Sequence, residues 1–482
     1  MEHPTHTFER DNAHPPASAR RGLEWLAVAH AAGMLLLATW GFGGGTAWVR
    51  TALTYLGGAG IFLLLAHLAT QLHRGSGLLR SVAGLAPLLG FNLLVLVGAF
   101  TPSFRELLYE GSPLLVPNTV SNWLPSSARP ALALRELALF NALFLPCFNL
   151  SLIVRSRHRL RGLLIFAATN AVVLSIFGTL QKLAHSPGLF FGRVKSPQPY
   201  FFSSFIYHNH WGAFALLMIA VCAALAWYYA QRGGYRDFFH SNAFSAVLGL
   251  LLIAATIPLS GSRSSTLLLA GLLTGGLLHV IIDLFRTRRD GDSVTGAFVS
   301  VCVATLLGVA AIIYVGSETI TTRVAKTQEQ LATMQAHGGI GSRATLYHDT
   351  WQMARAKPVF GWGMASYPHV FQLYNTQTAT ADRLPVFYAD AHSDWLQAIA
   401  EHGFVGTALL ALCALLPLSH LRARHLRHPL PNYLLAGCAL IVLYAWVEFP
   451  FGNAAVVFTW WLCLFTAVRY ARLDSSGTGP ST

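Results

Sequence analysis

Long apolar runs dominate the sequence, and short polar segments separate them. The runs recur at lengths of about 18 to 24 residues, the length a helix needs to cross a ~30 Å hydrocarbon core. Hydrophobic residues occupy 54% of the 482 positions and charged residues only 11%. The pattern predicts an all-α polytopic membrane protein with twelve transmembrane helices, at residues 23–40, 51–70, 78–100, 131–154, 162–181, 209–230, 242–259, 264–285, 294–315, 392–419, 431–448 and 453–470.

Arginine is unevenly distributed between the two sides of these predicted spans. It clusters in the termini and in alternate short loops, at 10–21, 74–80, 155–161, 232–236, 286–289, 422–427 and 469–472. The positive-inside rule assigns these segments, and both termini, to the cytoplasm. The net charge of +13 is therefore mainly topological, with added contacts to anionic membrane lipids, and no basic surface interleaved with aromatic residues indicates nucleic acid.

One long polar stretch interrupts the apolar pattern, from Gly316 to Ala391. Apolar positions at helical spacing predict an amphipathic surface helix over 319–336. A second helix is expected from Ser342, a favourable N-cap, to Pro358. The expected organisation is a disordered cytoplasmic tail at 1–22, transmembrane helices at 23–315, an outward helical loop at 316–391, transmembrane helices at 392–472 and a cytoplasmic tail at 473–482.

Two arginines on the outward side are candidates for binding an anion. Arg343 lies in the first turn of the predicted helix at 342–358, where helix amides and a guanidinium can both donate to phosphate oxygens. The alternative is a structural arginine that stacks on Tyr347 or pairs with Asp349. Arg263 follows Ser262 at the outer mouth of an apolar helix, where an arginine without a ligand or buried partner is costly.

His392 begins the tenth predicted span. On a continuous helix it shares one stripe with Gly403 and Gly406, which lets a neighbouring helix approach and hold the imidazole rigidly. A neutral histidine there is a candidate general base, oriented by Asp390 or Asp394. Two alternatives remain open: a divalent-metal site formed by these three residues, and a histidine that only caps the helix at the interface.

The outward segment 182–208 contributes further polar and aromatic residues to the same side. They are Arg193, Lys195, Tyr200 and, at the mouth of the next span, His210. Such a segment suits one wall of a lipid head-group site, or an aromatic belt at the membrane interface.

Three motifs in order resemble the bacterial O-antigen ligases and the wider O-antigen ligase and polymerase superfamily. They are Gly261-Ser262-Arg263-Ser264-Ser265, then Ser342-Arg343 followed by Trp351, Pro358, Gly361 and Gly363, then His392-Ser393 with Gly403-Phe404-Val405-Gly406. The resemblance covers roughly 207–406, and the twelve-span layout and the large outward loop agree with it.

This resemblance implies an inner-membrane glycosyltransferase of a Gram-negative bacterium, similar to the GT-C class, with the loop 316–391 in the periplasm. The implied donor is O-antigen on undecaprenyl diphosphate, and the implied acceptor is a sugar hydroxyl of the lipid A core oligosaccharide. The reaction is expected to be inverting, with no metal or other cofactor. His392 is then the base, Arg263 and Arg343 stabilise the leaving diphosphate, and the donor site includes Arg193, Lys195, Tyr200, His210 and Asp390.

Two rival functions remain. An O-antigen polymerase or a protein O-oligosaccharyltransferase would share the donor and differ in the acceptor. A twelve-span secondary transporter belongs to a different class. It would need an acidic coupling residue within a span, and Glu448 at a span edge is the closest candidate.

Overall fold

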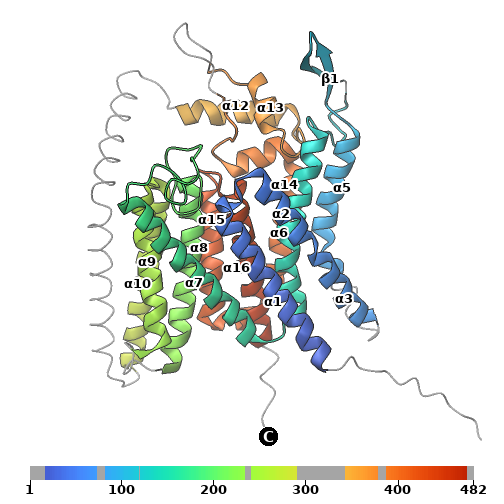
Figure 1. The fold of residues 1–482 in the computed structure, drawn as a ribbon. Coiled ribbons are helices and arrows are strands. Elements are labelled where there is room, and N and C mark those ends of the chain that lie inside the picture. Colours follow the sequence, from blue (N-terminus) through green and yellow to red (C-terminus); the bar gives the residue numbers. More distant parts are fainter. Residues whose placement is uncertain are drawn as a thin grey trace, which may run out of the picture.

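The computed structural model describes residues 17–72, 82–118, 120–233, 240–289, 342–377 and 387–474. Long helices packed side by side form the body of this part of the chain (Figure 1). Two helices, α12 (Ser342–Ala356) and α13 (Tyr367–Val370), cover one end of the bundle (Figure 1). We call this end the α12 end.

Within the described residues, nine helices are long and apolar enough to cross a membrane, where α2 and α3 together make one span. They are α1 (Ala17–Trp40), α2 (Ala47–Gly58) with α3 (Gly60–Leu72), α6 (Pro130–Ile153), α7 (Arg157–Leu183), α8 (His208–Gly233), α9 (Asn242–Ser260), α10 (Arg263–Arg289), α14 (Asp394–Ser419) and α16 (Ala454–Asp474). Two shorter apolar helices are α5 (Ala86–Phe100) and α15 (Pro429–Tyr444). This arrangement confirms the predicted all-α polytopic membrane protein. The predicted span at 294–315 and surface helix at 319–336 lie outside the described residues.

Helices α16 and α8 form the centre of the bundle, and most of each is buried. A helix that is apolar on all sides is buried by its neighbours, and α16 shows why. Its Trp461 and Phe465 rings pack against Phe144 of α6, with ring centroids 4.8 and 5.3 Å apart. In contrast, α10 is largely exposed at the edge of the bundle.

A β-hairpin rises from the α12 end between α5 and α6 (Figure 1). Strands β1 (Phe104–Tyr109) and β2 (Ser112–Pro117) pair antiparallel. The two turn residues, Glu110 and Gly111, have φ values of 49° and 79°. Positive φ at both turn positions matches the twist of a two-residue hairpin. No strand is predicted from the sequence between the spans at 78–100 and 131–154.

The predicted stripe of His392, Gly403 and Gly406 on one helix is wrong. His392 precedes α14, which begins at Asp394, and its own φ is 51°. The helix is then interrupted at Gly403, whose φ of 62° and ψ of −173° are not helical. No continuous helical face therefore joins the three residues.

The backbone at Gly403 packs closely against the loop that follows α12, and not against a neighbouring helix. A Cβ on Gly403 would lie 2.3 Å from the carbonyl oxygen of Val359. The opened helix uses its free backbone groups there, since Phe404 donates to the Pro358 carbonyl at 2.8 Å. The break thus fastens α14 to the loop that follows α12.

Candidate functional site

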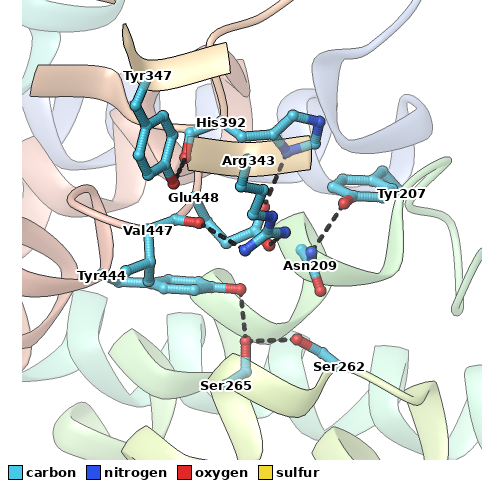
Figure 2. A network of polar contacts seen from close by, with 10 residues as sticks. All are labelled: Tyr207, Asn209, Ser262, Ser265, Arg343, Tyr347, His392, Tyr444, Val447 and Glu448. Atoms are coloured by element: carbon cyan, nitrogen blue, oxygen red, sulfur yellow. Dashed lines mark hydrogen bonds and ion pairs between the residues drawn. The ribbon is translucent and has the colours of Figure 1, made fainter. Parts of the chain in front are cut away.

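A buried glutamate forms the centre of a polar network at the α12 end. Glu448 lies in the connection between α15 and α16, and its side chain is only 3% exposed. Its Oε1 accepts a hydrogen bond from Arg343 Nη2 at 2.8 Å, and its Oε2 faces His392 Nδ1 at 3.6 Å (Figure 2). Arg343 Nη1 also donates to the carbonyl of Val447 at 3.3 Å. One carboxylate therefore bridges two residues that the sequence analysis selected as catalytic.

Glu448 lies beyond the end of α15, whereas the predicted span 431–448 ends at this residue. Helix α15 ends at Tyr444, and the chain then turns, with Val447 and Glu448 both donating to the Tyr444 carbonyl at 3.1 Å. Pro450 follows closely and cannot continue a helix. The turn places the carboxylate at the mouth of the bundle, in reach of α12.

The charges in this network support one another. Burial alone would raise the pKa of Glu448, but the His392 ring and the Arg343 guanidinium outweigh burial and hold that pKa below its ordinary value. Burial would lower the pKa of Arg343, and the adjacent Glu448 carboxylate instead raises it. Both groups are therefore ionised at neutral pH, and the arginine charge is offset by the glutamate.

The backbone around His392 is tied to the network from two directions. The Tyr347 hydroxyl, one turn after Arg343 on α12, donates to the His392 carbonyl at 3.0 Å. Asp394 Oδ2 accepts a hydrogen bond from the Phe451 amide at 2.8 Å. Asp394 is thus bound to backbone, and Glu448 takes the position beside the imidazole that the sequence analysis considered for Asp390 or Asp394.

The Phe449 ring packs against His392 and also against Tyr207 and His210, at the start of α8. Its ring centroid lies 4.9 Å from that of His392, 5.1 Å from that of His210 and 5.5 Å from that of Tyr207. His210 is half-buried and packs against Phe449. The Tyr200 carbonyl accepts the His208 amide at 3.1 Å, which fastens the segment before α8 to that helix. Through Phe449, Tyr207 and His210 at the start of α8 thus lie near His392.

Arg193 and Lys195 lie in the same connection between α7 and α8, and both side chains are exposed. A β-bridge between Leu189 and Val194 shapes the turn that carries them. Asp390 is half-buried, and this burial raises the pKa of its carboxyl, against the opposing effects of His392 and Arg50. None of these three side chains belongs to the network drawn around Glu448 (Figure 2).

Arg263 begins α10 directly beside the floor of the network. Gly261 supplies the left-handed turn before it, with a φ of 81°. The preceding Ser262 donates to Ser265 at 2.8 Å, and Ser265 donates to the Tyr444 hydroxyl at 3.0 Å (Figure 2). Tyr444 ends the helix that leads to Glu448. Arg263 is thus an exposed cation linked through its neighbouring serine to the residues beneath Glu448.

The described residues contain no group of three or more His, Cys, Asp or Glu side chains placed to hold a metal ion. The polar groups at the site are a carboxylate, an imidazole and a guanidinium. This arrangement suits the binding of an anion by Arg343 and the acceptance of a proton by His392.

The fold and the site together define a multi-pass membrane protein with an arginine, histidine and glutamate network at one end of the helix bundle. Residues 248–411 match the family described as O-antigen ligase, and this match supports the resemblance to the O-antigen ligase and polymerase superfamily. The matched stretch runs from α9 into α14 and includes Arg263, Arg343 and His392. Curated proteins give no match to this chain. The match supports an enzyme in general.

Proposed function

We propose that the protein is an O-antigen ligase. It transfers O-antigen polysaccharide from undecaprenyl diphosphate to a sugar hydroxyl of the lipid A core oligosaccharide. The observation that carries the proposal is the pairing of His392 and Arg343 through one buried carboxylate, Glu448. A diphosphate leaves readily, so the enzyme chiefly needs cations for the growing negative charge and a base for the acceptor hydroxyl.

The residues take complementary parts in this proposal. His392 Nδ1 faces Glu448, which leaves Nε2 to accept the proton of the acceptor hydroxyl. Arg343 and Arg263 bind the diphosphate, and the wall formed by Arg193, Lys195, Tyr200 and His210 extends the donor site. Attack by the acceptor from the side opposite the leaving group inverts the anomeric centre. The proposed reaction needs no metal or other cofactor.

The proposed setting is the inner membrane of a Gram-negative bacterium, with both termini in the cytoplasm. Arginines gather at the end of the bundle opposite α12, at the start of α7 and the end of α16 (Figure 1). The positive-inside rule favours that end as cytoplasmic and the α12 end as periplasmic. The protein would thus meet its lipid-linked donor and lipid A acceptor at the periplasmic face, embedded in membrane lipids.

Transfer in vitro tests this function. Purified protein is combined with lipid-linked O-antigen and rough lipopolysaccharide, with and without EDTA. We expect O-antigen to appear on the lipopolysaccharide in both conditions. Elongation of the lipid-linked chain without transfer to lipopolysaccharide would indicate an O-antigen polymerase, and transfer to protein would indicate a protein O-oligosaccharyltransferase. Activity lost in EDTA and restored by Mg²⁺ would assign a metal to the site.

A further inference from the structure

The two oxygens of Glu448 are engaged unequally. Oε1 makes a 2.8 Å hydrogen bond to Arg343, whereas Oε2 and His392 Nδ1 stand 3.6 Å apart (Figure 2). Both of these latter atoms are buried, and neither has a hydrogen-bond partner. A buried polar pair just beyond hydrogen-bond distance is costly, and a small movement of the carboxylate would close it. The other oxygen of the same carboxylate is bound to Arg343.

The Arg343 side chain is accessible to a ligand, whereas the Glu448 side chain is not. Its side chain is 51% exposed, whereas that of Glu448 is 3% exposed. A guanidinium carries five N–H donors, and the contacts to Glu448 and Val447 involve its two terminal nitrogens. Phosphate oxygens accept guanidinium donors in bidentate fashion and carry more charge than one carboxylate. A diphosphate arriving at this surface would therefore compete with Glu448 for Arg343.

We propose that Arg343 exchanges partners when the donor binds, and that this exchange activates His392. Without donor, Arg343 holds Glu448. When the lipid diphosphate takes the guanidinium, Glu448 closes on His392 Nδ1–H and fixes the tautomer in which Nε2 accepts a proton. This inference rests on the proposed function, and it adds an order: the donor must bind before the acceptor hydroxyl is deprotonated.

The proposed chemical step moves one proton, forms one bond and breaks one bond. The acceptor O–H proton moves to His392 Nε2 as the acceptor oxygen forms its bond to the anomeric carbon. The bond from that carbon to the diphosphate oxygen breaks, and the lipid diphosphate leaves with the electron pair, bound by Arg343. The resulting imidazolium lies beside the Glu448 carboxylate, which no longer shares its charge with the arginine.

Binding of undecaprenyl diphosphate in detergent micelles separates this exchange from a fixed ion pair. Glu448→Gln keeps the shape of the side chain and removes the charge that competes for Arg343. With exchange, this variant should bind the lipid diphosphate about 3- to 10-fold more tightly, the scale of a partly exposed ion pair, while transfer falls at least about 100-fold. If Glu448 instead holds Arg343 in its binding position, the same variant should bind more weakly, and that result would overturn the proposal.

Three further variants make the result specific. Arg343→Gln should abolish the gain when combined with Glu448→Gln, as a double-mutant cycle requires for two coupled residues. Glu448→Asp keeps the charge and should bind as the wild type does, which checks that the site is folded. Glu136→Gln breaks the Arg50–Glu136 pair near the same end of the bundle and should leave binding unchanged. A gain in that variant too would show a general effect of freed arginines and refute the exchange.

Failure of the exchange and failure of the proposed function give different results. Wild-type protein that neither binds undecaprenyl diphosphate nor transfers glycan would remove both. Wild-type protein that binds and transfers, with no tighter binding in Glu448→Gln, would remove the exchange alone.

Discussion

Replacing His392 by glutamine separates proton transfer from positioning. The imidazole Nδ1 faces Glu448 Oε2, and the ring packs edge-on against Phe449 with centroids 4.9 Å apart. A glutamine amide can donate to Glu448 from the same position, and the Tyr347 hydrogen bond reaches the backbone carbonyl, which the substitution leaves in place. The variant should therefore fold and bind the donor, but it has no group that accepts the acceptor proton.

The expected losses of activity and of stability differ in size. Removal of a general base lowers turnover roughly 10²–10⁴-fold, which corresponds to about 3–5 kcal/mol of transition-state stabilisation. The His392 side chain is 29% exposed, and its aromatic contact with Phe449 is worth about 0.5–1.5 kcal/mol. A loss of stability on that scale leaves most of the protein folded, so it cannot produce the expected loss of turnover.

Initial transfer rates at saturating lipid-linked donor, together with thermal unfolding, measure both quantities. His348→Gln is the matched control, because His348 lies on α12 with a side chain that is 65% exposed and outside the Glu448 network. We expect wild-type transfer from this control. Transfer by His392→Gln at the wild-type rate would show that His392 only positions other groups, and Asp390 would be the next candidate base.

Three other expectations concern the cations, the topology and the acid side of the stability profile. Arg263→Ala and Arg343→Ala should each cost about 2–4 kcal/mol of transition-state stabilisation in transfer assays, and lysine should rescue only in part because it cannot make the bidentate contact. Near-normal transfer by an alanine variant at normal expression would remove that arginine from the site. A cysteine at Leu108, on the 81% exposed hairpin position, should react with an impermeant thiol reagent in intact spheroplasts, whereas one at Arg424 should react only after permeabilisation; the reverse pattern would invert the orientation. The pKa of Glu448 lies below its ordinary value of 4.5 in the folded protein, so the unfolded state takes up the proton first as pH falls. The melting temperature should thus drop below about pH 4.5 more steeply in wild type than in Glu448→Gln, and equal slopes would contradict the ion pair.

The spans and two residues of the site could be predicted from local sequence. Hydropathy reports how well a segment suits lipid, so α6, α8 and α16 follow directly from their apolar runs. His392 and Arg343 were recognisable because polar chemistry has few places in such a chain. Arg343 lies within the long polar stretch and His392 directly follows it. The β-hairpin was not predicted, because its apolar residues lie within the segment that connects the spans predicted at 78–100 and 131–154.

The role of Glu448 could not be predicted, because it depends on contacts between residues far apart in the chain. Glu448 and Arg343 are separated by 105 positions. Local sequence also gives little reason for α15 to end at Tyr444, since Ala445, Trp446 and Val447 are all apolar. One signal was present: an acidic residue at the end of an apolar run has a high insertion cost and implies a partner.

Two glycines of the motifs, Gly361 after Arg343 and Gly403 after His392, contribute to the site through the backbone. Gly361 and Gly403 both have positive φ, and a Cβ on Gly361 would lie 2.4 Å from the Glu401 carbonyl oxygen. This close approach lets the Glu401 side chain accept the amides of Ala365 and Tyr367, at 3.1 and 2.9 Å. The first half of α14 is thereby fastened to the layer that contains α12. His392 directly precedes α14 and Arg343 lies in the first turn of α12, so this contact joins the two elements that carry the partners of Glu448.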